Sequence, residues 1–544
     1  MTTTTAPDTA SADTERGDRP TVLIAEQLAP AGVAALEAAC DVTVADGWSP
    51  EELRERIGAF DALVVRSATK VTADLIAAGE RLRVIGRAGV GVDNVDLDAA
   101  SQRGIVVVNA PTSNVLSVAE HCMGLMLALA RNVARGDATL KAGEWQRSKL
   151  SGIELGGRTL VLLGMGRIGQ LVAARAKAFD MHVVGYDPFL PKERFQRLGV
   201  EHATSIEAAL AQADVVSLHM PLTPETRGLI GTQQLAQMPA GALLINTARG
   251  ALVDLDAVEE SIAAGHLGGA ALDVFPSEPP APHPLFARSN VLVTPHLAAS
   301  TREAQDRAGE QVAEQVVAAL CGGVVTSAVN VPAIGAEDLE ALQPWVPVVA
   351  RLARLAGQLA AGAPHALRVS ARGEIAGYDV RMLSTGALVG LLTGATEDPV
   401  NVVNAPHVAQ ARGLAVETST DETARTYHSL AVVGVDSSDG SAEVVGTTIG
   451  AEARPWLTHV LGFAIDIELA PHMAFFRYGD VPGVIGKVGS AFGEAGVNIA
   501  NMAVAREGGM ALMAVSFDEA PPTDVVEQLC AGSEFELARL CSLG

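Results

Sequence analysis

The sequence contains little cysteine, little positive charge and no long apolar run. Its five cysteines lie far apart and form neither a CxxC pair nor a metal-ligand spacing, so we expect reduced thiols, no bound metal and a cytoplasmic location. Lys and Arg number 39 against 63 Asp and Glu, and the formal net charge of -24 repels nucleic acid and anionic lipid. We therefore expect a small-molecule ligand. The cysteines are Cys40, Cys122, Cys321, Cys530 and Cys541.

The sequence also lacks a recognisable targeting or membrane-spanning segment. Residues 1–20 are rich in Thr, Ala and Asp, without a basic start or an apolar core, which predicts a disordered tail rather than a signal peptide. The longest apolar stretch, residues 115–130, contains Glu120 and His121 and is too short to span a bilayer. At 544 residues the chain exceeds one hydrophobic core, so a soluble protein of three or four domains is expected.

Two series of apolar runs alternate with helix-like segments. Residues 21–112 contain "TVLIA", "DVTVA", "DALVV", "LRVIG" and "GIVVV", and a second series runs from Thr159 to about Pro295. This alternation predicts parallel sheets covered by helices, an α/β fold. A long amphipathic helix follows residue 299 and can return to the first series. We therefore predict a domain of residues 113–298 inserted into a domain of residues 21–112 and 299–332.

The remaining chain predicts two further domains. Residues 321–332, "CGGVVTSAVNVP", have the Gly, Ser and Pro content of a linker. Residues 333–469 contain no lysine and form a less legible α/β region. Residues 470–544 predict a compact βαββαβ unit, with strands at "HMAFFRY", "VNIANMAVA", "GMALMAVSF" and "FELARL".

The stretch "GMGRIG" follows a strand and opens a helix, the context of a dinucleotide-binding turn. Gly164 permits the tight turn, Gly166 lets the backbone approach a pyrophosphate, and Gly169 allows close helix packing. Asp187 ends the next strand 18 residues later, where its carboxylate can accept hydrogen bonds from a ribose and favours NAD over NADP. The alternatives are a turn that only packs helix on strand and a solvated aspartate. The candidate cofactor residues here are Gly164, Gly166, Arg167, Ile168, Gly169 and Asp187.

Three residues at the carboxyl ends of the second series suit oxidation of a hydroxyacid. Neutral His296 can take the hydroxyl proton as a general base. Glu278 can orient the imidazole and stabilise its protonated form. Arg249 offers a planar fork for a carboxylate and the neighbouring oxygen. Each residue alone is more often structural, but ligands of open parallel sheets bind at this edge.

These motifs together resemble the D-isomer-specific 2-hydroxyacid dehydrogenases. The resemblance covers residues 21–332 and is carried by "GRAGVGVDNVD", "GMGRIG", "HMPLTPETRGLI", "NTARG", "LDVFPSEPP" and "TPHLAASTREAQ". It implies a Rossmann-type NAD domain inserted in a flavodoxin-like substrate domain, with catalysis in the cleft between them. It implies the roles given above for Arg249, Glu278 and His296, and it adds Asp273 near the nicotinamide.

We expect positively charged side chains of the first domain to determine which hydroxyacid is the substrate. Arg66 and Arg87 follow strands there, and they either hold a phosphate or form salt bridges between domains. The backbone of Gly89, Val90 and Gly91, with Asn114, can bind the substrate carboxylate. The resemblance is strongest to members that oxidise 3-phosphoglycerate to 3-phosphohydroxypyruvate, the entry to serine synthesis, so that reaction is expected.

The stretch "YGDVPGVIGKVGSAFGEAGVNIANM" resembles an ACT domain, a module that commonly pairs across a dimer to bind an amino acid. By this resemblance Tyr478, Asp480 and Asn498 meet serine as an effector, although Asp and Asn also favour turns on their own account. Residues 333–469 resemble the intervening domain of long family members. A homo-oligomer, plausibly a tetramer, is expected.

Two alternative functions remain open from the sequence. One is a dehydrogenase or reductase of an unphosphorylated hydroxyacid such as glyoxylate or hydroxypyruvate. The other is an NADH-sensing corepressor-like protein, in which protein binding matters more than turnover. The amino-acid module favours the phosphorylated substrate.

Overall fold

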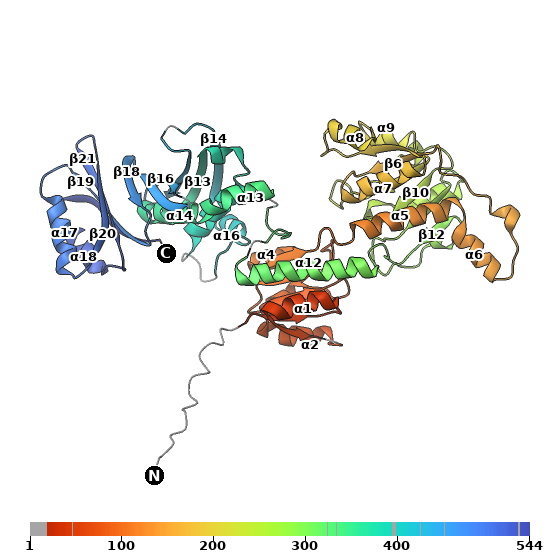
Figure 1. Cartoon of the computed structure of the whole chain (residues 1–544), viewed down its shortest axis with the longest axis horizontal. Helices are drawn as coiled ribbons and strands as arrows, with labels where there is room; N and C mark the ends of the chain where they lie inside the picture. Colours follow the sequence, from red (N-terminus) through yellow and green to blue (C-terminus); the bar gives the residue numbers. More distant parts are fainter. Residues whose placement is uncertain are drawn as a thin grey trace, which may run out of the picture.

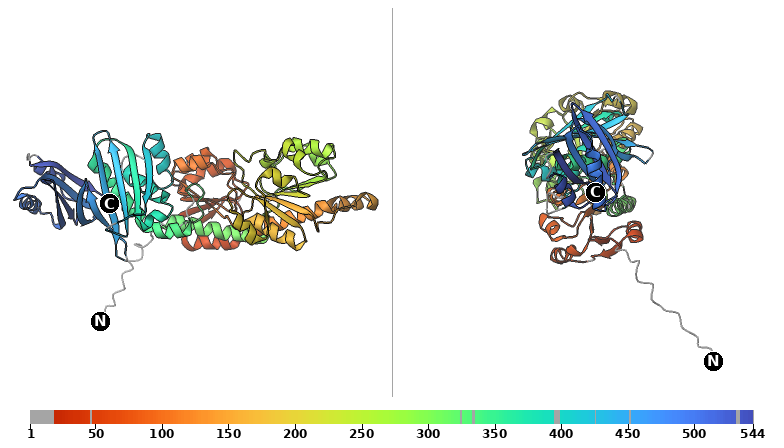
Figure 2. Two further views of the ribbon diagram at one scale, coloured as in Figure 1. Left: turned by 90° about the horizontal axis from the view of Figure 1, so that it is seen from above. Right: turned by 90° about the vertical axis from the view of Figure 1, so that its left-hand side faces the viewer.

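The computed structural model describes residues 19–45, 47–323, 325–332, 335–393, 399–424, 426–450, 452–530 and 534–543. The predicted disordered tail therefore lies almost wholly outside the described residues. The molecule is elongated, with a first sheet in the middle, a second sheet at one end and the C-terminal sheets at the other (Figures 1 and 2).

The first sheet has five parallel strands in the order β2-β1-β3-β4-β5, the flavodoxin-like order expected. Its strands are the predicted apolar runs. Three of its helices begin at side-chain caps, Ser49, Thr72 and Asp96, and Ser49 forms a capping box with Glu52. The strands are β1 (Thr21–Ile24), β2 (Asp41–Val44), β3 (Ala62–Val65), β4 (Val84–Arg87) and β5 (Val106–Asn109). The helices are α1 (Pro30–Ala39), α2 (Pro50–Arg56), α3 (Ala73–Ala78) and α4 (Leu97–Gln102).

Helix α12 (Arg302–Cys321) returns the chain to this sheet, as predicted (Figure 1). Its buried residues Ala308, Val312 and Val316 belong to the hydrophobic core under β1, β3 and β4. It packs closely on α1, because a Cβ on Gly32 would lie 2.7 Å from the carbonyl carbon of Gly309. The first sheet is thus completed by residues from both sides of the second.

The prediction that residues 321–332 form a linker is partly wrong. Asn330 Oδ1 accepts from the backbone N–H of Val107 at 2.9 Å, and Ser327 Oγ donates to the carbonyl of Asn109 at 2.7 Å. These bonds satisfy the free edge of β5, so Gly, Ser and Pro here serve an irregular edge segment rather than a free connection.

The second sheet has seven parallel strands in the order β12-β11-β10-β9-β6-β7-β8. The order reverses around β6, which places the turn after β6 at the topological switch point where α/β sheets bind ligands. Every predicted strand is present, and the two-residue β8 was not predicted. The strands are β6 (Thr159–Leu163), β7 (His182–Tyr186), β8 (Glu201–His202), β9 (Val215–Leu218), β10 (Leu243–Asn246), β11 (Gly269–Leu272) and β12 (Val291–Val293).

Seven helices accompany this sheet. The longest, α5, is the predicted apolar helix, and α6 projects away from the body (Figure 1). The helices are α5 (Val115–Ala130), α6 (Val133–Lys141), α7 (Arg167–Ala178), α8 (Lys192–Leu198), α9 (Ile206–Leu210), α10 (Thr232–Gln237) and α11 (Leu255–Ala263).

The less legible region contains a six-stranded sheet in the order β14-β13-β15-β16-β17-β18. Only β13 and β14 are parallel, and the other neighbours are antiparallel. The strands are β13 (Pro364–Gly373), β14 (Ala415–Asp421), β15 (Ser429–Ser437), β16 (Ser441–Ile449), β17 (Arg454–Val460) and β18 (Phe463–Glu468). The helices are α13 (Ala336–Leu342), α14 (Val346–Ala360), α15 (Arg381–Leu392) and α16 (Ala405–Ala411).

The last unit is the predicted βαββαβ fold, with strand order β20-β21-β19-β22. Strand β19 alternates between two cores, as its period of two requires. Phe476 and Tyr478 face helices α17 and α18, whereas Met473 and Phe475 join the core of the six-stranded sheet. The elements are β19 (His472–Gly479), α17 (Val484–Glu494), β20 (Ile499–Glu507), β21 (Met510–Phe517), α18 (Thr523–Cys530) and β22 (Phe535–Ser542).

Candidate active site

A cleft of about 570 Å³ lies between the first and second sheets. Its walls include Arg66, Arg87 and Gly89 from the first sheet, and Glu278 and His296 from the second. The carboxyl ends of both parallel sheets therefore face one cavity. Asn114, at the start of α5, and the first turns of α12 close its floor.

The predicted imidazole and carboxylate are in direct contact. Nδ1 of His296 lies 2.7 Å from Oε2 of Glu278, and both side chains keep about half or less of their surface exposed, 50% and 38%. Oε1 of Glu278 accepts from the backbone N–H of Phe275 at 3.1 Å. The carboxylate thus fixes the ring through Nδ1 and leaves Nε2 for other partners.

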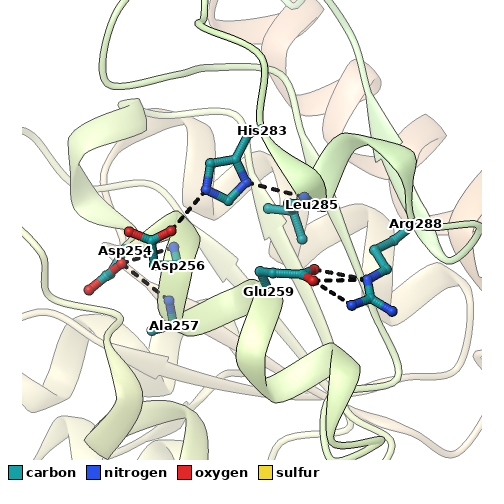
Figure 3. Close-up of polar contacts among 7 residues, drawn as sticks. All are labelled: Asp254, Asp256, Ala257, Glu259, His283, Leu285 and Arg288. Atoms are coloured by element: carbon teal, nitrogen blue, oxygen red, sulfur yellow. Dashed lines mark hydrogen bonds and ion pairs between the residues drawn. The ribbon is translucent and has the colours of Figure 1, made fainter.

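The loop that carries Glu278 is anchored on helix α11 (Figure 3). Nε2 of His283 lies 3.1 Å from Oδ1 of Asp256. Nε of Arg288 donates to both carboxylate oxygens of Glu259 at 3.1 and 3.0 Å. These contacts hold the C-terminal side of the proline-rich segment, from His283 to Arg288, on α11.

A buried aspartate supports the turn that bears His296. His296 adopts a positive φ of 51°, and its N–H donates to the carbonyl of Asp273 at 2.8 Å. The Asp273 carboxylate is fully buried and accepts from the backbone N–H groups of Leu297 and Ala298 at 2.7 and 2.9 Å. Burial alone would raise the pKa of Asp273, but hydrogen bonds from His121 and these N–H groups lower it. Asp273 lies beneath the site as an ionised anchor.

Arg249 crosses toward the first sheet. It follows β10, and its Nε lies 3.4 Å from Oδ2 of Asp93, while a Cβ on Gly91 would lie 2.6 Å from its Nη2. Strand β11 separates β10 from β12, which puts the strand ends carrying Arg249 and His296 about 10 Å apart. Arg249 and His296 therefore follow strand ends at the same edge of the second sheet.

Three arginines lie near one another at this cleft, and two of them, Arg66 and Arg87, line it. The pKa of Arg87 is lowered mainly by burial, and the nearby charges of Arg249 and Arg66 lower it further, against Asp93 and Glu26. Two buried polar atoms of residues that line the cleft, Nε of Arg87 and Oδ1 of Asn114, have no hydrogen-bond partner among the described residues. Such clustered cations and unpaired polar groups favour an anionic, hydrogen-bonding ligand.

The candidate carboxylate-binding backbone forms a tight loop beside these arginines. The carbonyl of Val90 accepts from Nδ2 of Asn109 at 2.6 Å, and that of Gly89 accepts from the N–H of Ala110 at 2.9 Å. A Cβ on Gly89 would collide with the Arg87 guanidinium. Glycine is therefore required where the guanidinium crosses the loop.

The glycine turn has the shape that a dinucleotide needs. Gly164 has a φ of 100°, and a Cβ there would lie 2.6 Å from the carbonyl oxygen of His219. A Cβ on Gly169 would lie 2.2 Å from the carbonyl oxygen of Gly164, whereas one on Gly166 would meet nothing within 4 Å. Two glycines thus close the turn, and the third leaves space at the N-terminus of α7 for a pyrophosphate.

Asp187 stands beside this turn, at the end of β7. Its Oδ2 accepts from the N–H of Met165 at 2.9 Å and its Oδ1 from the N–H of Phe189 at 3.0 Å. Each oxygen retains a lone pair for a ribose hydroxyl. Arg167 is exposed on the first turn of α7, and Ile168 packs partly against the core.

Comparison with known proteins agrees with this geometry. Residues 123–298 match the NAD binding domain of the D-isomer specific 2-hydroxyacid dehydrogenases, residues 341–460 the D-3-phosphoglycerate dehydrogenase intervening domain, and residues 472–531 the ACT domain. The chain is 44% identical to the D-3-phosphoglycerate dehydrogenase of Mycobacterium leprae, covering 94% of this chain and 97% of that one. It belongs to the D-3-phosphoglycerate dehydrogenase family.

Other relatives extend the likeness. The D-3-phosphoglycerate dehydrogenase of Methanocaldococcus jannaschii is 42% identical, over 93% of this chain and 97% of the relative. The crystal structure of D-lactate dehydrogenase from Aquifex aeolicus, complexed with NAD and lactic acid, is 29% identical with a TM-score of 0.51, covering 57% of this chain and all of that one. The predicted family and its NAD cofactor are thereby confirmed.

Two residues of this family member were missed from the sequence. Asp93 pairs with Arg249, and Glu26 binds the backbone around Arg66. Asp93 lies two residues after Gly91 in the quoted glycine motif, which was the available signal. For Glu26 the sequence contained no signal other than its position shortly after the strand β1.

The three predicted effector residues do not meet within one chain. Tyr478 is buried and its pKa is raised, first by burial and then by the charge of Asp480. Asp480 lies 3.1 Å from Nε of Arg506. Asn498 donates to Asp518 at 2.8 Å at the opposite end of β21 from Tyr478. Within one chain, Asn498 therefore lies apart from Tyr478 and Asp480.

Membrane and metal features were also compared with the expectations. No helix in the described part of the chain is long and apolar enough to cross a membrane. The same residues include no group of His, Cys, Asp or Glu arranged to hold a metal ion.

Proposed function

We propose that the chain oxidises 3-phosphoglycerate to 3-phosphohydroxypyruvate with NAD, the first step of serine synthesis. The observation that carries this proposal is one cleft that joins the His296–Glu278 pair to Arg66 and Arg87. A general base suits the hydroxyl, and two arginines suit a phosphate. The names of relatives from bacteria and archaea support the same reaction.

The chain's own residues divide the chemistry as follows. Nε2 of His296 takes the hydroxyl proton, and Glu278 holds the ring and balances its positive charge. Arg249 binds the carboxylate and the reacting oxygen, and the loop of Gly89, Val90 and Gly91 with Asn114 binds the carboxylate's other side. Bound NAD supplies a hydride acceptor at C4 of its nicotinamide. In the reverse direction His296 returns the proton.

The cofactor is held by the glycine turn and by Asp187. The open side of Gly166 and the N-terminus of α7 suit the pyrophosphate, and the carboxylate of Asp187 suits the ribose hydroxyls. Asp273 holds the His296 turn beside the nicotinamide position. We assign the domains as residues 21–112 with 299–332, 113–298, 333–469 and 470–544, consistent with the three matched segments.

A spectrophotometric assay of NADH formation tests the proposal. We expect turnover of 3-phosphoglycerate and weak turnover of D-glycerate, which lacks the phosphate. Arg66→Ala should raise KM for the phosphorylated substrate about tenfold or more, because it removes charge-assisted hydrogen bonds. Arg83→Ala is the matched control, since Arg83 lies exposed at the opposite edge of the same sheet.

The assay also separates the alternatives. Equal turnover with and without the phosphate would favour a general hydroxyacid reductase. NADH binding without turnover would favour a corepressor-like protein.

Serine feedback through the ACT domain is part of the proposal. Asp480, with Tyr478 near it, suits the serine ammonium, and Asn498 can donate to and accept from its polar groups. Because these residues occupy opposite ends of one sheet, two chains are needed to complete a site. This favours a homo-oligomer, such as the expected tetramer, and a serine titration of the same assay tests it. Cys40, Cys122, Cys321 and Cys541 are free, which suits the expected cytoplasmic location.

A further inference from the structure

The loop that carries Arg66 is held by two side chains rather than by backbone pairing. Oε1 of Glu26 accepts from the N–H groups of Arg66 and Thr69, both at 2.9 Å, and Oε2 accepts from that of Ala68 at 3.2 Å. Nδ2 of Asn94 donates to the carbonyls of Arg66 and Thr69 at 2.8 and 2.7 Å. Two side chains thus satisfy five backbone groups of one four-residue loop.

These two side chains come from the neighbouring loops of the same sheet edge. Glu26 follows β1, and Asn94 belongs to the loop after β4, which also contains Gly89 and Gly91. Asn94 therefore ties the loop of Arg66 to the glycine loop. A shift of either loop would break hydrogen bonds in the other.

The charge of Glu26 matters to this arrangement. A carboxylate only accepts hydrogen bonds, and three N–H donors converge on it. Burial alone would raise the pKa of Glu26, but the N–H groups of Thr69, Arg66 and Ala68 lower it, so the group is held ionised. In Glu26→Gln, the amide NH2 group would face at least one of these N–H donors and could not accept its hydrogen bond.

We infer that Glu26 and Asn94 are positioning residues that fix the Arg66 loop so that its guanidinium meets the substrate phosphate. Neither residue needs to touch the substrate. The guanidinium of Arg66 lies close to the loop that carries Glu26, because its Nη1 donates to the carbonyl of Gln27 at 3.3 Å. This inference rests on the proposed function, since it assigns a phosphate to Arg66.

Glu26→Gln is the main test, with Glu51→Gln as its control. Both glutamates line one pocket beside the first sheet, apart from the catalytic cleft. We expect Glu26→Gln to raise KM for 3-phosphoglycerate about tenfold, to change kcat by less than about threefold, and to leave kcat/KM for D-glycerate nearly unchanged. Inorganic phosphate, used as a competitive inhibitor, should bind about tenfold more weakly. Glu51→Gln should match the wild type.

A double variant shows whether Glu26 acts through Arg66. If it does, Arg66→Ala with Glu26→Gln should be no worse than Arg66→Ala alone, because the positioned group is already absent. Additive losses, equal losses for both substrates, or an unchanged KM and phosphate inhibition would each overturn the inference. If Glu26→Gln does not fold, Asn94→Ala tests the same loop with the same readouts.

Failure of this inference is distinguishable from failure of the proposed function. If the wild type does not prefer the phosphorylated substrate, the proposed function fails. If the wild type prefers it and Arg66→Ala abolishes that preference while Glu26→Gln and Asn94→Ala do not, only the positioning role fails.

Discussion

Two joints in this molecule are built in opposite ways. The joint between the first and second sheets is a polar cleft of about 570 Å³, bridged by the ion pair of Asp93 and Arg249. The joint between the six-stranded sheet and the ACT sheet is a continuous hydrophobic core that includes Met473, Phe475 and Leu512. Opening the first exposes charged groups that water solvates well, whereas opening the second exposes apolar surface.

The polar joint is also crossed by two chain segments that lie side by side. Nε of Arg307 donates to the carbonyl of Ser113 at 2.8 Å, and Nε2 of Gln311 donates to Oγ1 of Thr112 at 2.8 Å. A few such bonds keep the two sheets in register without packing them together. The catalytic half is therefore suited to opening and closing around ligands, and the C-terminal half to moving as one body.

The largest predicted effect is on the apolar joint. Phe475 is fully buried between the two sheets, so Phe475→Ala should cost about 3–5 kcal/mol. For a unit of this size that lowers Tm by about 10 °C. Scanning calorimetry should show the loss in the C-terminal transition alone, with turnover at low temperature unchanged.

Phe189→Ala is the control for that substitution, because Phe189 is 93% exposed. It should change stability by less than about 0.5 kcal/mol. Equal effects of the two substitutions would mean that the C-terminal sheets do not share a packed core.

The two halves also differed in how far the sequence predicted them. Strands buried on both faces, such as β6 and β10, are continuous apolar runs bounded by turn residues, so their positions could be predicted. The six-stranded sheet was less legible because strands such as β16 and the fully exposed β14 mix polar and apolar residues. Strands β15 to β18 pair as successive antiparallel hairpins, and among the antiparallel pairs only β13 and β15 lie far apart in the sequence.

The site followed the same division. His296, Glu278 and Arg249 could be predicted as candidates because they follow strands whose carboxyl ends share one edge. Asp93 and Glu26 were missed because their roles arise only where loops from separate strands meet. The separation of Asn498 from Tyr478 could not be predicted from the sequence, since the pairing of the strands decides which end of β21 each residue lies beside.

The next prediction concerns the polar joint. His296→Asn should lower kcat by about 10²-fold or more, since it removes the general base, equivalent to about 2.7 kcal/mol in the barrier. Stability and NADH binding, followed by calorimetry and by fluorescence, should stay near wild type because the side chain is half-exposed.

A second His–Glu pair provides a matched control. His182 and Glu201 lie 2.9 Å apart on the same sheet, away from the cleft. His182→Asn should leave kcat unchanged. A similar loss in both variants, or none in His296→Asn, would remove the imidazole from the mechanism.

The smallest predicted effect is on acid stability, and it belongs to the catalytic half. Burial lowers the pKa of His219 to about 4, below its value of about 6.5 in an unfolded chain. As the pH falls, the unfolded state therefore takes up the proton first. The contribution of His219 to the free energy of unfolding is constant above about pH 6.5 and is lost between about pH 6.5 and 4. A complete shift is worth ~3 kcal/mol, and because the residue as a whole is only partly buried we expect about 2 kcal/mol. We expect His219→Gln to reduce the loss of stability between pH 7 and pH 5 in the transition of the second sheet, measured by calorimetry. His365→Gln, at an exposed position, is the control and should leave that loss unchanged. An undiminished loss in His219→Gln would show that His219 is not its source.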